Sequence, residues 1–193
     1  MSDKYQKKYR IPSARLPGYD YGQNGAYFIT ICTKNRVHYF GEIIQSSGGI
    51  AETQNFASLQ PTPIGTIVNE FWKKIPEHFP FIILDEYVVM PDHIHGILVI
   101  NKEETHDNAS QHPETGYTNK FGPQSGNISS VIRGYKAGVK SYATINEIEF
   151  AWQPRFHDHI IRDNDEMNRI RKYIIENPDN WLVEKNNQEG LYM

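Results

Sequence analysis

The sequence has a single cysteine in 193 residues, no long apolar run and no surplus of positive charge. One thiol, Cys32, cannot form an internal disulfide, and such scarce cysteine suits a reducing cytoplasm. A membrane-spanning helix needs about 20 consecutive apolar residues, and the sequence has no such run. Residues 1–10 are polar, unlike a signal peptide. We therefore expect a cytoplasmic protein with no membrane partner.

The net charge is −3 at pH 7, from 20 Lys and Arg against 23 Asp and Glu. This balance does not indicate nucleic-acid binding, but the basic residues are clustered. One cluster is a basic N-terminal arm, residues 1–16, whose cations are Lys4, Lys7, Lys8, Arg10 and Arg15. For the arm alone, ordinary solvated charge is the favoured interpretation.

Hydrophobic residues make up 38% of the sequence and aromatic residues 12%, enough for a packed core in a chain of this length. We expect one domain over residues 1–193. Over residues 101–126 the composition turns polar and aperiodic, which predicts a mobile loop. His106 and His112 lie in this loop, so we do not expect them to bind a metal.

Four segments have the β-branched and aromatic composition of strands. They are residues 26–33, 81–90, 93–100 and 156–162. The second and third flank Pro91 and Asp92, which predict a hairpin turn. Residues 45–60 indicate a loop or a weak hairpin.

Apolar residues recur at helical spacing in three further segments. They are residues 62–75, 128–145 and 163–177. Thr62 and Pro63 are typical of a helix start, and a D-x-x-E capping box begins the last helix. We expect Pro76 to end the first helix and Pro178 to end the last, because proline disfavours helix in the residue before it.

The helix over 128–145 carries a second basic cluster, Arg133, Lys136 and Lys140, on one stripe beside its apolar face. A row of cations along a helix suits a phosphate backbone. A solvated face is equally compatible with the pattern.

The order of elements is strand, helix, strand, strand, helix, strand, helix, which predicts an α+β fold. An antiparallel hairpin and two crossover helices indicate a ferredoxin-like (RRM-like) sandwich. Its four-stranded antiparallel sheet would have helices on one face. The other face would be free for a ligand or for the C-terminal helix.

Two histidines follow the hairpin turn. His93 and His95 point to the same face of their strand, together with Ile97 and Val99, while Ile94 points to the other. Adjacent imidazoles in an apolar strand predict a shared divalent metal. Taken alone, a hydrogen-bonded histidine pair is the commoner arrangement.

A rival pair, His157 and His159, flanks Asp158 in the strand over 156–162. The intervening Asp158 indicates an edge strand. This pair is an alternative metal site, although a structural role or a place near the substrate is favoured.

On the last helix, Tyr173 borders the apolar face, and Asn177 lies one turn further on the same side. A tyrosine in such a place is usually a core residue with a hydrated hydroxyl.

Several motifs together resemble a known family, the single-tyrosine, His-hydrophobic-His transposases. The motifs are Y-V-V-M-P-D-H-I-H-G-I, W-Q-P-R-F-H-D-H-I-I-R, Y-I-I-E-N-P, R-L-P-G-Y-D-Y and N-R-V-H-Y-F-G-E-I. They are most similar to the insertion-sequence-200-like group, in particular the tyrosine transposases associated with repetitive extragenic palindromes. The resemblance covers residues 15–181, and the loop over 101–126 is longer than in compact relatives.

The resemblance implies a role for each site residue. Tyr173 corresponds to the nucleophile, His93 and His95 to the metal-binding pair, and Asn177 to the polar residue that helps hold Mg²⁺ or Mn²⁺. It further implies cleavage and rejoining of single-stranded DNA at hairpins through a 5′-phosphotyrosine. Both a monomer and a homodimer are compatible with the sequence.

We therefore expect a transposase whose phosphate contacts come from Arg15, Arg133, Lys136 and Lys140. Two alternatives stay open. A nonenzymatic ferredoxin-like nucleic-acid-binding module would need neither Tyr173 nor the histidines. A zinc-dependent hydrolase would use both histidine pairs and form no covalent adduct with DNA.

Overall fold

The structure is a computed structural model of the chain that describes residues 4–5, 8–9, 19–46, 56–102 and 125–190. Several predictions lie outside these residues: Arg15 and most of the N-terminal arm, residues 103–124 of the polar loop, and with them His106 and His112. Two-residue strands β1 (Lys4–Tyr5) and β2 (Lys8–Tyr9) pair with each other near the start of the chain.

The central feature is a four-stranded antiparallel sheet with the order β6-β7-β3-β8. Its strands are β3 (Gly25–Cys32), β6 (Ile82–Val89), β7 (His93–Ile100) and β8 (His157–Ile161). This is the strand order of a ferredoxin-like sandwich, and the predicted α+β fold is confirmed. Because β3 and β7 are the central pair, both edges of each are hydrogen-bonded to a neighbouring strand. The expectation that Asp158 marks an edge strand is confirmed as well.

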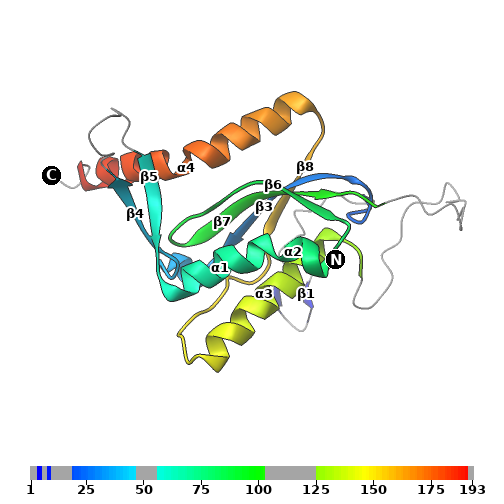
Figure 1. Ribbon diagram of the computed structural model, residues 1–193, viewed down its shortest axis with the longest axis horizontal. Helices are drawn as coiled ribbons and strands as arrows, with labels where there is room; N and C mark the ends of the chain where they lie inside the picture. Colours follow the sequence, from blue (N-terminus) through cyan, green and yellow to red (C-terminus); the bar gives the residue numbers. More distant parts are fainter. Residues whose placement is uncertain (1–3, 6–7, 10–18, 47–55, 103–124, 191–193) are drawn as a thin grey trace, which may run out of the picture.

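Two helices cover one face of the sheet, α1 (Pro63–Lys73) and α3 (Ile128–Ile145) (Figure 1). Their apolar stripes, including Val68, Trp72 and Val139, form the main core with Tyr27 and Leu98 of the sheet. The predicted cap of α1 is present, since Thr62 Oγ1 accepts a hydrogen bond from Gly65 N at 3.1 Å. Periodicity in the sequence located these helices because their buried residues recur at helical spacing.

The last helix, α4 (Asn164–Gly190), crosses the opposite face (Figure 1). Ile174 packs there against Ile97 and Ile161 in a second, smaller core. Ile97 and Val99 therefore share the face of the histidines, as predicted. The capping box is only half formed: Glu166 N donates to Asp163 Oδ1 at 2.7 Å, but the Glu166 carboxylate accepts from Arg162 N.

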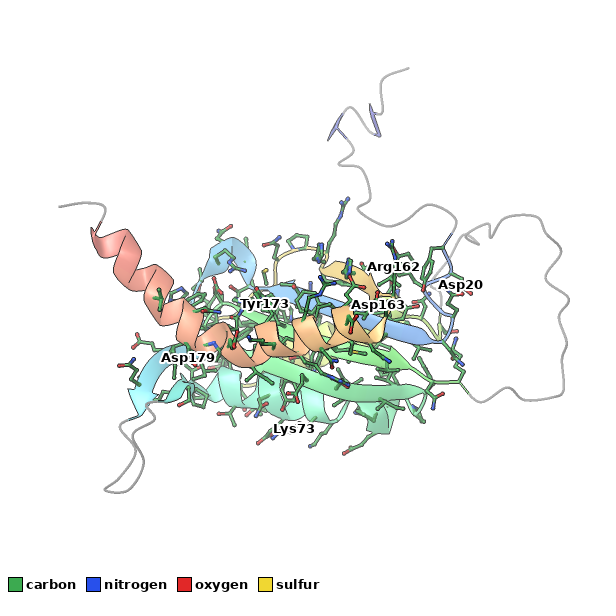
Figure 2. All side chains as sticks on the ribbon, turned by 90° about the horizontal axis from the view of Figure 1, so that it is seen from above. Asp20, Lys73, Arg162, Asp163, Tyr173 and Asp179 are labelled. Carbon is green, nitrogen blue, oxygen red and sulfur yellow. The ribbon has the colours of Figure 1, made fainter. Side chains whose placement is uncertain are left out.

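The prediction that Pro178 ends the last helix is wrong. Helix α4 continues to Gly190 with Pro178 inside it, and its axis changes direction near Asp179 (Figure 2). A proline removes one backbone hydrogen bond and kinks a helix, but packing can hold the helix on both sides of the kink. Here Asp179 Oδ1 accepts a hydrogen bond from Ala57 N at 3.2 Å, which holds the far part of α4 in place.

Two other boundaries differ from the prediction. Helix α1 already ends at Lys73, and Pro76 lies in the first turn of a separate short helix, α2 (Ile75–His78), where proline is tolerated. The weak hairpin exists, as β4 (Gly41–Ser46) and β5 (Phe56–Pro61), but its first strand begins before residue 45. Among the described residues, every helix is too short or too polar to cross a membrane.

Candidate active site

His93 and His95 lie at the start of β7, directly after the turn at Pro91 and Asp92, and both are buried. Their ring centroids are 4.4 Å apart. The alternation of a strand brings both rings to the face that α4 crosses. In this position they are shielded from bulk water but adjacent to the helix that carries Tyr173.

The two ring nitrogens of His95 have different partners. Nδ1 lies 2.9 Å from Thr30 Oγ1 on the neighbouring strand, and Nε2 lies 3.2 Å from the Tyr173 hydroxyl. Burial, with smaller contributions from His93 and Arg36, lowers the pKa of His95 to about 3. His95 is therefore neutral at physiological pH, the form in which imidazole binds a metal.

His93 is oriented by a buried carboxylate. Its Nδ1 lies 2.6 Å from Asp92 Oδ1, while Arg36 Nε donates to Asp92 Oδ2 at 2.8 Å. Arg36 also approaches Nδ1, but at 3.5 Å, so the shorter contact decides the tautomer: Nδ1–H donates to Asp92. A carboxylate behind one nitrogen leaves the other, Nε2, as the nitrogen that can bind a metal.

Tyr173 and Asn177 lie one turn apart on α4, as predicted, but in different environments. The Tyr173 side chain is 45% exposed, whereas Asn177 is buried. The Tyr173 ring lies edge-on to Phe28, with centroids 6.1 Å apart. Figure 2 looks onto α4 and shows Tyr173 on the part of the helix that crosses the sheet. The tyrosine hydroxyl is thus directed to the histidines, while the residue still borders solvent.

A bidentate ion pair fixes α4 on the sheet two residues before Tyr173. Arg171 Nε and Nη2 donate to Asp85 Oδ1 and Oδ2 at 2.8 and 2.6 Å. Asp85 lies in an irregularity of β6, where the register with β7 shifts between Leu84 and Tyr87. The hydrogen bond and charge of Arg171 lower the pKa of Asp85. This contact sets the position of the helix, and so of Tyr173.

One pocket of ≈ 500 Å³ contains four of the predicted residues. Its lining consists of Arg36, His93, His95, Tyr173, Asn177, Asn180, Trp181 and Val183. Arg36, Trp181 and Asn180 were not predicted from the sequence. Trp181 lies four residues after Asn177 on the same helix, so helical spacing places it at the site because the helix continues past Pro178.

The donor set fits a hard or borderline divalent ion. Two imidazoles whose Nδ1 atoms have protein partners, together with a buried amide, offer neutral nitrogen and oxygen ligands. In the part of the chain that the structure describes, no group of three or more His, Cys, Asp and Glu side chains could hold a metal ion. The four-histidine zinc site therefore does not form there, and any metal would depend on an amide such as Asn177.

The rival histidine pair lies elsewhere on the same face of the sheet. His159 Nε2 lies 2.8 Å from Glu166 Oε1, and His157 is exposed. Strand β3 separates this pair from His93 and His95. A role for His157 and His159 near the substrate stays a prediction.

The second basic cluster lies on α3, on the opposite side of the sheet from α4 (Figure 1). Lys136 Nζ donates to the carbonyls of Gln153 and Arg155 at 2.7 and 2.8 Å, and Lys140 Nζ to that of Phe150 at 2.8 Å. Arg133 is exposed. Two of the three cations thus stabilise the loop before β8, and DNA binding by the cluster stays a prediction.

Comparison with known proteins finds a relative by sequence and related solved structures. No family model matches the sequence. An uncharacterized protein of Haemophilus influenzae is 37% identical over 189 residues, which cover 94% of this chain and 92% of the relative. The chain belongs to the same family as this protein.

Among solved structures, the chain is similar to a REP-associated tyrosine transposase bound to a REP hairpin. The TM-score is 0.53 and the sequence identity 19%, and the match covers 88% of this chain and 74% of the other. A likeness at this identity shows a shared fold. The α+β fold of this chain is therefore one that a REP-associated tyrosine transposase also has.

Proposed function

We propose that this protein is a transposase that cleaves and rejoins single-stranded DNA, with Tyr173 as the nucleophile. The observation that carries the proposal is the 3.2 Å contact between the Tyr173 hydroxyl and His95 Nε2, within one pocket that also contains His93 and Asn177. The sequence motifs and the fold of the transposase neighbour support it independently.

The reaction begins when Tyr173 Oη attacks the phosphorus of a DNA phosphodiester. A bond forms between Oη and phosphorus, and the bond between phosphorus and the 3′ oxygen breaks. The phenol loses its proton to water, and the departing 3′ oxygen gains one. The products are a 5′-phosphotyrosine on Tyr173 and a free 3′ hydroxyl. The charge of the diester is unchanged, so the protein needs no additional acid or base to balance the step.

The covalent intermediate explains how strands can be rejoined. A phenol has a pKa of about 10, which makes Tyr173 a better leaving group than an ordinary alkoxide. Attack by a 3′ hydroxyl on the phosphotyrosine then reverses the reaction and releases Tyr173. Because the intermediate conserves the phosphodiester bond energy, joining requires no nucleotide cofactor.

Mg²⁺ or Mn²⁺, held by His93, His95 and Asn177, would polarise a phosphate oxygen as a Lewis acid. The protein's own contribution is orientation. Asp92 holds the ring of His93 and Thr30 that of His95. Arg36 keeps the buried charge of Asp92 paired.

The substrate we propose is single-stranded DNA that carries a hairpin next to the cleavage site. The transposase neighbour was solved with a REP hairpin, and Tyr173 is exposed enough to meet a phosphate outside a duplex. Both a monomer and a homodimer are compatible with this proposal, and a cytoplasmic location suits it.

A screen for covalent adducts tests the proposal. The protein is incubated with a library of single-stranded hairpins with variable tails, labelled at either end, and products are separated on a denaturing gel. We expect a protein–DNA adduct that retains the label 3′ of the break, is absent with perfect duplexes, disappears in chelator and returns with Mg²⁺ or Mn²⁺. A nonenzymatic binding module would shift the same DNA on a native gel and give no adduct.

A further inference from the structure

Trp181 is a large aromatic residue that lies at the candidate active site. It follows Pro178 on α4, is half-buried, and lines the same pocket as Tyr173. Its ring centroid is 5.9 Å from that of His93 and 5.5 Å from that of His38. An indole thus extends the row of rings that runs through His93 and His95 to Tyr173.

Packing of the core does not account for this tryptophan. Among the described residues, the two apolar cores form without Trp181, whereas Trp72 is fully buried and Trp152 packs against Phe40 and Phe150. The cleavage step proposed above gives Trp181 no role either. A tryptophan that lines an open pocket with charged and amide side chains, instead of a core, offers its ring to a ligand.

The turn of α4 that carries Trp181 has a tertiary contact of its own. The hydrogen bond from Ala57 N to Asp179 Oδ1 holds the adjoining turn of α4 against β5. Figure 1 shows this part of α4 beside the β4–β5 hairpin. A preorganised aromatic ring loses little conformational entropy on binding, which favours stacking.

We propose that Trp181 is the stacking site for an unpaired nucleobase next to the phosphate that Tyr173 attacks. The inference rests on the proposed function and extends it to a base subsite. Every nucleobase has a π-face, and stacking on aromatic side chains is the usual way that proteins hold single strands. Trp181 is eight residues from Tyr173, about 12 Å along a helix, so nucleotides near the attacked phosphate are within reach.

Two side chains near Trp181 could bind the phosphate and the base edge of a stacked nucleotide. Arg36 also lines the pocket, and its guanidinium is about half exposed although it pairs with Asp92. It is the cation that a phosphate next to the stacked base would meet. Asn180 lines the pocket on the helix turn that carries Trp181, and its amide can hydrogen-bond to a base edge.

Fluorescence gives the first test, because nucleobases quench an indole on which they stack. The probes are oligothymidylate and an abasic oligonucleotide of equal length and charge. We expect thymidylate to quench the wild-type protein, the abasic probe to leave fluorescence unchanged, and Trp181→Phe to lose the quenching. Trp72 is buried and Trp152 lies on the other face of the sheet, so both serve as background.

Affinity measurements with two variants distinguish stacking on an aromatic ring from contact with any large apolar side chain. Trp181→Leu should bind thymidylate about tenfold more weakly, and Trp181→Phe, which keeps a π-face, should retain most of the affinity. Ile175→Ala is the control, since Ile175 is exposed on the same helix outside the pocket. Equal binding of thymidylate by the wild type and Trp181→Leu, or equal quenching by both probes, would overturn the proposal.

The last test uses wild-type protein alone, so misfolded variants cannot affect it. In an oligonucleotide that forms the Tyr173 adduct, each nucleotide around the break is replaced in turn by an abasic one. We expect an abasic nucleotide at one position beside the break to lower the yield of adduct about tenfold. Equal yields at all positions would exclude the base subsite and leave the cleavage proposal intact. Quenching by thymidylate without any adduct would support the base subsite and contradict the cleavage proposal.

Discussion

The hydroxyl of Tyr173 lies 3.2 Å from Nε2 of His95, so the proposed nucleophile and a proposed metal ligand meet at one nitrogen. In the tautomer in which Nδ1–H of His95 donates to Thr30 Oγ1, the lone pair of Nε2 accepts either the phenol proton or a metal, but not both. Binding of a metal to His95 therefore frees the Tyr173 hydroxyl for the substrate.

This competition predicts that Tyr173→Phe binds Mn²⁺ at least as tightly as the wild type, because the variant has no hydroxyl to displace. Isothermal titration calorimetry on both proteins measures the difference. His95→Ala is the comparison that should lose affinity. Markedly weaker binding by Tyr173→Phe would show instead that the hydroxyl is itself a ligand.

The histidine pair should be essential for metal binding and for cleavage. We expect His93→Ala and His95→Ala each to lower the rate of adduct formation by about 100-fold or more, because even groups that only orient ligands cost 10- to 100-fold. His78→Ala is the matched control, since His78 is exposed on α2, and His106→Ala and His112→Ala should also change little. Full activity of either pocket variant, or of the wild type in chelator, would reject metal-assisted cleavage.

The ion pair between Asp85 and Arg171 should contribute stability that depends on pH. The folded state lowers the pKa of Asp85, mainly through the hydrogen bond from Arg171, so it favours the charged carboxylate. The contribution is present above the unfolded carboxyl pKa of about 4 and is lost as the pH falls through the lower folded value. Asp85→Asn should therefore unfold at a lower temperature than the wild type at pH 7, and the difference should shrink as the pH falls below about 4.

Thermal unfolding followed by circular dichroism between pH 7 and pH 3 measures whether the difference in unfolding temperature shrinks or grows as the pH falls. Lys172→Ala provides the control, because its pair with Glu176, at 3.7 Å, is solvent-exposed and should contribute little. Arg171→Lys should also slow adduct formation by about tenfold, since loss of the bidentate contact lets Tyr173 shift. An unfolding difference that grows toward pH 3 would contradict the assignment.

The basic cluster on α3 gives a prediction about DNA affinity. If Arg133, Lys136 and Lys140 contact phosphates of a single strand, their joint replacement by Gln should reduce the slope of log K against log salt by roughly two units, at about 0.7 for each contact. Because Lys136 and Lys140 also bind backbone carbonyls, unfolding temperatures must be compared first. An unchanged slope in a folded triple variant would assign the phosphate contacts to other residues, such as Arg36 at the pocket or Arg15 in the arm.

Local patterns in the sequence were sufficient for most of the fold. The bounds of α3 and β7 match their predictions, since periodicity and turn residues fix them locally. Pro178 did not follow its local preference, because tertiary contacts such as that between Asp179 and Ala57 hold the helix beyond it. Because the predicted helix ended before Pro178, Trp181 was not predicted to lie at the site.

Part of the site was also predictable from local sequence patterns. His93 and His95 were found from strand alternation, and Tyr173 and Asn177 from helical spacing together with the family resemblance. The contact of Arg36 with Asp92 depends on a turn at Asn35 and Arg36 with φ of 55° and 56°, in the left-handed region that arginine seldom adopts. Such a turn has no clear signature in a single sequence.

The most direct test of the account is the site of DNA attachment. The adduct is digested with protease and nuclease, and mass spectrometry locates the remaining nucleotide on the peptide. We predict that it lies on Tyr173, that Tyr173→Phe folds and binds DNA but forms no adduct, and that Tyr142→Phe, altered on the opposite face of the sheet, behaves as the wild type. A nucleotide attached to any other residue, or an adduct that persists in Tyr173→Phe, would contradict the account.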